Sequence, residues 1–149
     1  MSLPPGWLGL ADNFLGLPEP WCHPDQAGVY ILPAAYEHTS SYVKGSDRGP
    51  AAIIEASQQV ELYDETLGME PYRQWGGVAT RAPLELGGRV EAKAVEAIHD
   101  YVAPLTRGGR FLVTLTGEHT GALGAIRAHA RRYPDMCVLQ IRSEEHTSE

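Results

Sequence analysis

Apolar residues follow two alternating patterns along the chain, short continuous runs and stripes at helical spacing. The runs "GVYILPAAY" (28–36), "FLVTLTG" (111–117) and "MCVLQI" (136–141) predict three buried strands. A further short strand is predicted near Val78. Runs that are apolar throughout are typical of a parallel sheet with both faces covered.

Helical patterns separate these runs. One helix is predicted to begin near Pro50 with Asp47 or Ser46 as its N-cap, a second over 90–102 and a third over 121–134. Strands that alternate with helices in this way predict an α/β fold around a parallel sheet. The side chains expected to face the core are Ile53, Ala56 and Val60 in the first helix, Val90, Ala94, Val95, Ile98 and Val102 in the second, and Leu123, Ile126 and Ala130 in the third.

Residues 1–27 are rich in proline and glycine and show neither pattern, so we expect an irregular arm. Its aromatic and aliphatic residues are expected to pack it onto the domain that spans 28–141: Trp7, Phe14, Leu15 and Trp21. Cys22 and His23 are adjacent in this arm, but without further spaced ligands a loop without a metal is the preferred interpretation. Together with Cys137, in an apolar run, Cys22 indicates no disulfide framework.

The 149 residues are 43% hydrophobic, enough for one globular core, and carry a formal net charge of −7. An acidic protein is a poor non-specific partner for nucleic acid or an anionic membrane, whereas a small cationic substrate is tolerated. No run approaches the roughly 20 apolar residues that span a bilayer, and the N-terminus lacks the pattern of a signal peptide. A cytoplasmic protein is therefore expected.

Glu118 and His119 follow the strand predicted at 111–117, at the end of a parallel sheet where binding sites gather. Three interpretations compete for "TGEHTGALG". A phosphate cradle is disfavoured because Glu118 would repel an anion and the dinucleotide and Walker motifs are absent. A metal or acid–base site would use the imidazole as ligand and the carboxylate beside it. A helix-capping pair with no further chemistry is the third.

The segment "GGRFLVTLTGEHTGALGAIRAH" (108–129) resembles the Gly-Gly-(Asp/Glu)-His-Ser region of the ureohydrolase family, which includes arginases and agmatinases. "FLGLP", "TSSYVKGSDRGPAAIIEASQQVELYDE" and "MCVLQI" resemble the same family in the order it uses them, and the agmatinase-like branch fits best. The similarity covers about residues 14–141. It departs at Thr116, where the family has a glycine, and at Thr120, where it has a serine.

The resemblance implies an arginase-like, three-layer α/β/α fold with two Mn²⁺ ions held by His and Asp side chains at the strand ends. It implies hydrolysis of a guanidinium substrate to urea and an amine, with agmatine and putrescine as the expected pair, in polyamine metabolism. His119 is then a metal ligand, and Glu118 acts through its neighbours or in structure. A homo-oligomer is expected, because family members form trimers or hexamers.

The family continues after the strand resembling "MCVLQI" with Asp-Ala-His-x-Asp and a later Asp-x-Asp, but this chain reads "RSEEHTSE". Glu144, Glu145 and His146 do not reproduce that ligand spacing. The codons AGA TCG GAA GAG CAC ACG TCT GAA encode these eight residues and match the start of a sequencing-library adapter. We therefore interpret 142–149 as an adapter-derived tail, not a natural acidic one, and expect an inactive, poorly soluble amino-terminal fragment without a two-metal centre. The alternative function is a non-catalytic α/β binding or regulatory module.

Several polar side chains near the predicted strand ends stay open in role. His38, in the loop after the first strand, is either at the substrate mouth or simply solvent-exposed. Packing and substrate contact are equally open for Tyr36, Ser40, Ser41 and Tyr42. Two further histidines, His99 and His129, lie among charged residues of their helices and are expected at the surface.

Overall fold

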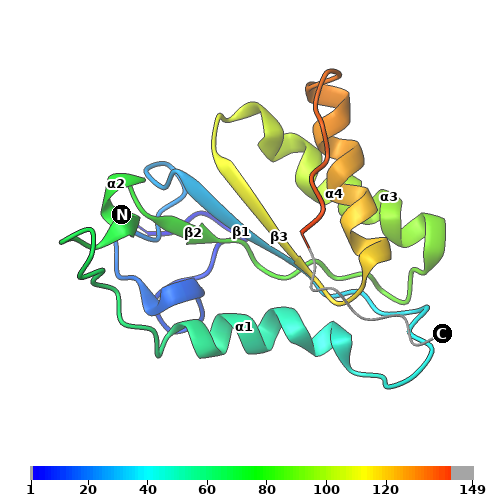
Figure 1. Cartoon of the computed structure of the whole chain (residues 1–149), viewed down its shortest axis with the longest axis horizontal. Coiled ribbons are helices and arrows are strands. Elements are labelled where there is room, and N and C mark those ends of the chain that lie inside the picture. The colour runs from blue at the N-terminus through cyan, green and yellow to red at the C-terminus, as the bar shows by residue number, and fades with distance from the viewer. Residues whose placement is uncertain (1, 142–149) are drawn as a thin grey trace.

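The computed structural model of the chain describes residues 2–141. Its sheet has three parallel strands in the order β2-β1-β3, with β1 in the centre (Figure 1). The pairing runs from Val29 opposite Phe111 to Ala34 opposite Thr116, so β1 and β3 end at the same edge. Except for 136–141, the predicted strands are confirmed, two from apolar runs and the short one near Val78: β1 (Val29–Ala34), β3 (Phe111–Thr116) and β2 (Val78–Thr80).

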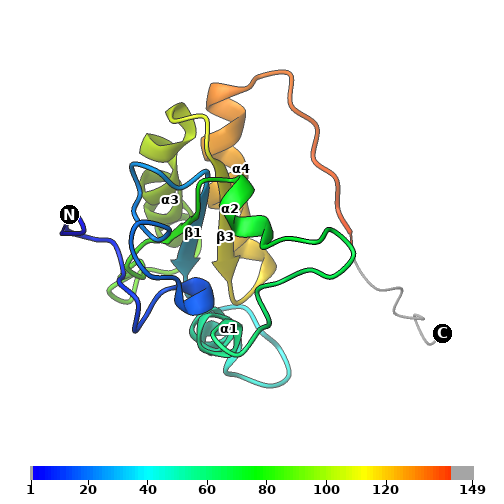
Figure 2. The ribbon, with the colours of Figure 1, turned by 90° about the vertical axis from the view of Figure 1, so that its left-hand side faces the viewer.

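Helices cover both faces of this sheet, with α1 on one side and α3 and α4 on the other (Figure 2). The helix bounds are α1 (Gly49–Ser57), α2 (Pro71–Gln74), α3 (Glu91–Val102) and α4 (His119–Arg132), and the 3-10 turns are η1 (Phe14–Gly16), η2 (Ser46–Arg48) and η3 (Ala103–Arg107). Within residues 2–141, no helix has both the length and the apolar character needed to cross a bilayer. The predicted layered α/β architecture is confirmed.

The core lies on both faces of β1, because successive side chains of a strand point to opposite sides. Tyr30 and Leu32 pack with buried residues of α3 and α4, whereas Ile31 packs with Val78 and the arm. The arm is held as predicted, with these side chains partly buried against the two clusters: Trp7, Phe14, Leu15 and Trp21. Asn13 fixes its path, since its side chain bonds both the N–H and the C=O of Leu17 at 2.8 Å.

The α3–α4 contact uses small residues on α4, which corrects the predicted inward face. Leu123 and Ala130 are exposed and Ile126 is partly buried, while the buried positions are Gly121, Gly124 and Ala128. A Cβ atom on Gly124 would lie 2.7 Å from both the Ile98 Cβ and the Val95 carbonyl oxygen. The missing side chain therefore lets the two helices approach closely. The stripe predicted for α3 is confirmed at Ala94, Val95, Ile98 and Val102, with Val90 exposed at the N-cap.

The predicted inward face of α1 is also wrong, by one residue. Pro50, Ile54 and Ser57 are buried, whereas Ile53, Ala56 and Val60 are exposed. Ser57 is accepted in the interior because its hydroxyl donates to the Ile54 carbonyl at 2.6 Å and accepts the Leu15 N–H at 2.8 Å. Neither Ser46 nor Asp47 caps the helix, because both lie in η2 and Arg48 occupies the N-cap position.

The strand predicted over 136–141 does not form. This segment runs as an extended connection at the outside of the molecule (Figure 2), and Val138, Leu139 and Ile141 are 61%, 84% and 88% exposed. Among the described residues, β3 pairs with β1 alone. Among residues 2–141, the outer edge of β3 and the apolar residues of 136–141 are therefore both without a strand partner.

Candidate functional site

The junction between β3 and α4 lies at the carboxyl edge of the sheet, as predicted. β3 ends at Thr116, α4 begins at His119, and Ala34 ends β1 directly opposite Thr116. The loop that leaves β1 therefore emerges beside Glu118 and His119. Glu118 occupies the N-cap position of α4, but its side chain makes no capping hydrogen bond. The interpretation of Glu118 as a helix-capping side chain is therefore wrong.

Glu118 instead binds the loop after β1. Its Oε2 atom accepts the backbone N–H groups of His38 at 3.1 Å and Thr39 at 3.0 Å, and its Oε1 accepts the Thr39 hydroxyl at 2.9 Å. The Ser40 hydroxyl is 3.4 Å from Oε2. Burial raises the pKa of the Glu118 carboxyl, but the hydrogen bonds from His38, Thr39 and Thr120 together outweigh this effect. The pKa therefore lies below its ordinary value. The group is an anion at neutral pH.

Gly117 allows the loop to approach this closely. A Cβ atom there would lie 2.6 Å from the Tyr36 carbonyl oxygen and 2.7 Å from both the Ser46 carbonyl carbon and the Asp47 nitrogen. These atoms belong to the residues just before and just after the loop, which enclose Gly117 from both sides. Only glycine fits between them.

Thr116 is accommodated by a second glycine. A Cβ atom on Gly121 would overlap the Thr116 Oγ1 and lie 2.9 Å from the Thr116 Cβ. The extra bulk at the position where the ureohydrolase motif has glycine is therefore offset one helical turn later. The Thr116 hydroxyl itself is buried without a hydrogen-bond partner in the described part of the chain.

The loop of residues 37–45 is tied together at its base. The Glu37 carboxylate accepts the Gly45 N–H at 2.7 Å, and the Lys44 ammonium donates to the His38 carbonyl at 3.2 Å. The Gly45 N–H lowers the pKa of the Glu37 carboxyl most, and Ser40, Lys44 and Ser46 add to it against partial desolvation. Glu37 thus stays ionised and closes the loop.

The open assignments around this loop now separate. Tyr36 is a packing residue, buried with its hydroxyl accepting the Glu91 N–H at 2.9 Å. His38 is exposed, with its Nε2 4.0 Å from the Glu91 carboxylate. Tyr42 is 96% exposed near the tip of the loop. Ser41 is exposed, and Ser40 is half-buried beside Glu118.

His119 is exposed at the first position of α4. The imidazole is therefore accessible to a ligand at the edge where the loop and the strand ends meet. Among residues 2–141, however, no group of three or more His, Cys, Asp or Glu side chains is gathered as a metal site. The two-metal centre implied by the resemblance does not fit the described residues by themselves, and Glu144, Glu145 and His146 lie outside them.

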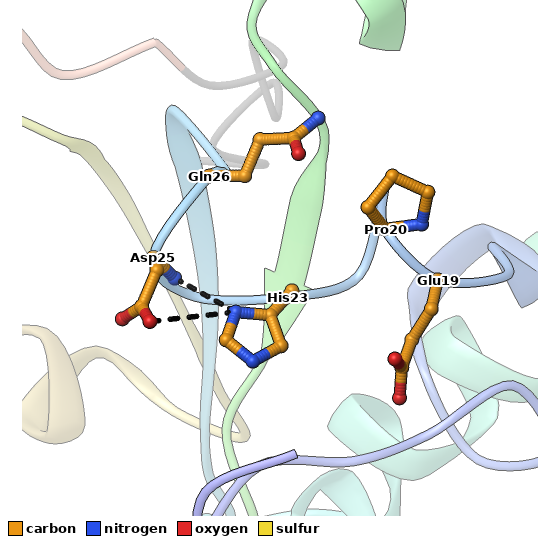
Figure 3. Close-up of a pocket in the computed structure, with 5 residues that line it drawn as sticks. All are labelled: Glu19, Pro20, His23, Asp25 and Gln26. Carbon is orange, nitrogen blue, oxygen red and sulfur yellow. Dashed lines mark hydrogen bonds and ion pairs between the residues drawn. The ribbon is translucent and has the colours of Figure 1, made fainter. Parts of the chain in front are cut away.

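The Cys22–His23 pair lies away from this edge, in the arm. One stretch of the arm lines an open cavity of about 480 Å³. Figure 3 shows the five residues that line it: Glu19, Pro20, His23, Asp25 and Gln26. The His23 Nδ1 atom accepts the Asp25 N–H at 3.3 Å and lies 3.8 Å from its carboxylate. Cys22 is buried, and burial raises the pKa of its thiol. The geometry agrees with a packed loop.

The surface placement predicted for two histidines needs correction. His99 is 8% exposed between α3 and neighbouring elements, where its Nδ1 lies 2.8 Å from the Asp100 carboxylate and its Nε2 has no partner in the described residues. His129 is half-buried, with Nδ1 2.8 Å from the Ala125 carbonyl. The charged residues beside each histidine suggested that its helix face is exposed. The contact between α3 and α4 covers part of that face.

Known proteins of one family match most of this chain. The sequence model of the arginase family matches residues 27–143. The chain is 41% identical over 109 residues to the N(1)-aminopropylagmatine ureohydrolase of Synechocystis sp., covering 70% of this chain and 35% of that protein. It is 32% identical over 127 residues to the agmatinase of Bacillus anthracis, covering 84% and 42%.

A solved structure shares the fold. The crystal structure of a putative agmatinase from Clostridium difficile superposes with a TM-score of 0.66 at 16% identity, over 74% of this chain and 40% of that one. The chain thus spans between about a third and two fifths of the length of the curated relatives it matches.

Proposed function

Because the chain belongs to the arginase family, we propose that the full-length protein hydrolyses a guanidinium substrate, releasing urea and leaving an amine. The family match includes the β3–α4 junction, where Glu118 and His119 lie beside the loop after β1. This junction, with an accessible imidazole at the carboxyl edge of a parallel sheet, is the observation that carries the proposal.

Agmatine is the proposed substrate, with putrescine as the amine product. The relatives quoted above are named for agmatine or its aminopropyl derivative. Without the tail at 142–149, Lys+Arg falls from 12 to 11 and Asp+Glu from 19 to 16, and the remaining net charge of −5 favours approach of a small cation over an anion. We also propose a cytoplasmic location and a homo-oligomeric assembly, as in the family.

We propose Mn²⁺, two ions per site, as the metal, with His119 as one ligand. The other ligands would come from residues beyond those that the structure describes, because residues 2–141 gather no metal-binding group of three or more. A neutral imidazole together with carboxylates is a suitable ligand set for Mn²⁺. His119 would serve as a ligand because it is exposed as the first residue of α4, at the carboxyl edge of the sheet.

The tail at 142–149 lies outside the described residues, and we propose that it is adapter-derived. In that case the natural gene continues after Ile141 with an Asp-x-His-x-Asp segment. Re-reading the locus with adapters removed tests this directly. A continuation without ligating side chains would favour the non-catalytic binding or regulatory module.

Metal-dependent urea release from the full-length protein tests the function. We expect urea from agmatine with Mn²⁺ supplied and none after chelation, with arginine and N(1)-aminopropylagmatine as competing substrates. His119→Ala should lower metal affinity and turnover together, by about tenfold or more. His129→Ala, on the same helix but bonded to its own backbone, is the matched control. Urea release that survives chelation, or that is unchanged in His119→Ala, would refute the proposal.

The 149-residue chain alone is proposed to be inactive. A single imidazole does not offset the cost of removing water from a divalent ion, so it should not retain two metals. Elemental analysis after dialysis measures this. Two Mn²⁺ per chain, with urea produced from agmatine, would overturn both the fragment and the adapter interpretations.

A further inference from the structure

The geometry points to Glu118 as a positioning residue that holds the loop of residues 37–45 as one wall of the substrate mouth. The inference rests on the proposed function, because the mouth is that of the guanidinium site. It assigns to Glu118 a task separate from that of its neighbour His119. His119 binds the metal, and Glu118 places the part of the chain that the substrate meets.

Internal hydrogen bonds close the loop on itself. Glu37 accepts the Gly45 N–H across the base, and Lys44 donates to the His38 carbonyl across the middle. Both bonds join residues of the same loop. They set its shape and leave its orientation relative to the sheet to be decided by bonds to other segments.

At residues 38–40 the bonds to other segments converge on one carboxylate, whereas at the far end of the loop the Gly45 carbonyl accepts the Arg48 N–H at 3.1 Å. Among the described residues, Glu118 is the hydrogen-bond partner that residues 38–40 have outside the loop, through two backbone N–H groups and two hydroxyls. Hydrogen bonds to an ionised carboxylate are roughly twice as strong as neutral ones. The other charged contact, from Glu91 to the exposed His38, is 4.0 Å long and open to solvent, so it contributes little.

The loop that Glu118 holds carries an exposed aromatic side chain, which suits a guanidinium ion. Tyr42, near its tip, is 96% exposed, and an aromatic face attracts planar cations. Glu118, which holds the loop, is adjacent in sequence to His119, the proposed metal ligand. Gly117, enclosed by the residues just before and just after the loop, fixes the depth of the approach. On this inference, the loop and His119 lie at the same carboxyl edge of the sheet, where an approaching cation would meet both.

Glu118→Gln in the full-length protein tests the inference. The variant keeps the size of the side chain and removes the charge that four donors share. We expect amide hydrogen exchange at His38 and Thr39 to become faster by about tenfold or more, since residues 38–40 lose their bonds to another segment. We expect KM for agmatine to rise about fivefold or more with kcat changed by less than about twofold, because the loop contributes binding. Metal content should stay that of the parent protein.

Two variants control for general damage. Glu91→Gln removes a carboxylate that faces the same loop without bonding its backbone, and should leave exchange and KM unchanged. Glu118→Asp retains a carboxylate and should lie closer to the parent protein than Glu118→Gln does. A merely structural defect would lower the stability of all regions and would not be rescued selectively at residues 38–39.

Distinct results would overturn the inference. Unchanged exchange in Glu118→Gln would show that another contact holds the loop. Faster exchange with unchanged KM would show that the loop is not part of the mouth. Loss of metal equal to that in His119→Ala would assign Glu118 to the metal site instead. If the parent protein released no urea, the proposed function would fail and the substrate role with it, while the exchange measurement would still decide whether Glu118 holds the loop.

Discussion

The Thr116 side chain occupies the space that a Cβ atom at position 121 would need. The effects of substitutions at these two positions on the free energy of unfolding should therefore be strongly non-additive. Adding a methyl group at position 121 would overlap the Thr116 hydroxyl and bring a carbon to 2.9 Å from the Thr116 Cβ. Rotation of the threonine about χ1 does not solve this, because its Cβ stays at 2.9 Å whichever of its substituents points toward position 121. The Cβ itself is attached to β3, which is paired with β1.

The magnitudes decide the sign of Gly121→Ala. Replacing glycine by alanine inside a helix stabilises by about 1 kcal/mol. Overpacking a well-filled contact costs about 1–3 kcal/mol, so Gly121→Ala should lower the free energy of unfolding by about 1 kcal/mol. In a Thr116→Gly background the overlap is gone, and the same change should raise the free energy of unfolding by about 0.5–1 kcal/mol. The coupling energy is then about 2 kcal/mol, within the range for contacting residues.

Urea denaturation of four proteins measures the coupling: the parent, the two single variants and the double variant. The full-length, metal-free protein is the material, so that metal binding does not contribute to the free energy of unfolding. Thr116→Gly alone accounts for the loss of a strand side chain. Additivity of the two single changes within about 0.5 kcal/mol would show that the two residues do not constrain each other, and would refute the packing argument.

Two further predictions concern the helix contact and the loop. Gly124→Ala should lower the free energy of unfolding by about 1–2 kcal/mol, because the new methyl would meet the backbone of the neighbouring helix. Gly9→Ala is the control: its methyl would make an ordinary contact at 3.5 Å, and its free energy of unfolding in the same urea titration should stay within about 0.5 kcal/mol of the parent value. The pKa of Glu37 is held below its ordinary value of 4.5, so its bond to Gly45 persists at neutral pH and is lost as pH falls through the lowered pKa. An NMR titration of the Gly45 amide should show that midpoint below 4.5 and lose it in Glu37→Gln; a midpoint at or above 4.5 would contradict the assignment.

Hydrophobic pattern was sufficient where one element decides its own burial. Apolar runs predicted β1 and β3, and helical spacing predicted the α3 stripe except at Val90. A similar run at 136–141 and the spacing in α1 gave wrong predictions. The pattern failed where the neighbour decides. On α4 the larger side chains Leu123 and Ile126 suggested the inward face, but close approach to α3 favours the face with the least volume, at Gly121 and Gly124.

The site was predictable in place and not in detail. A strand followed by Glu118 and His119 indicates the carboxyl edge of a parallel sheet. The partners of Glu118 are 78–80 residues away in the sequence, and nothing in the spacing of "EHTS" indicates which carboxylate its amides will meet. The buried imidazole of His99 was missed for a similar reason, because its cover comes from a packed neighbour and its own helix face reads as polar.

The distance in sequence between Glu118 and the loop it holds sets the order in which the site can form during synthesis. The 80 residues that separate His38 from Glu118 take roughly 4–16 s to translate at 5–20 residues per second. For most of that interval β1 and its loop have been made, but β3, which pairs along the whole of β1, has not. The nascent chain therefore exposes an apolar strand and an unanchored polar loop together, and a chaperone that binds β1 would delay assembly of the mouth as well as of the sheet.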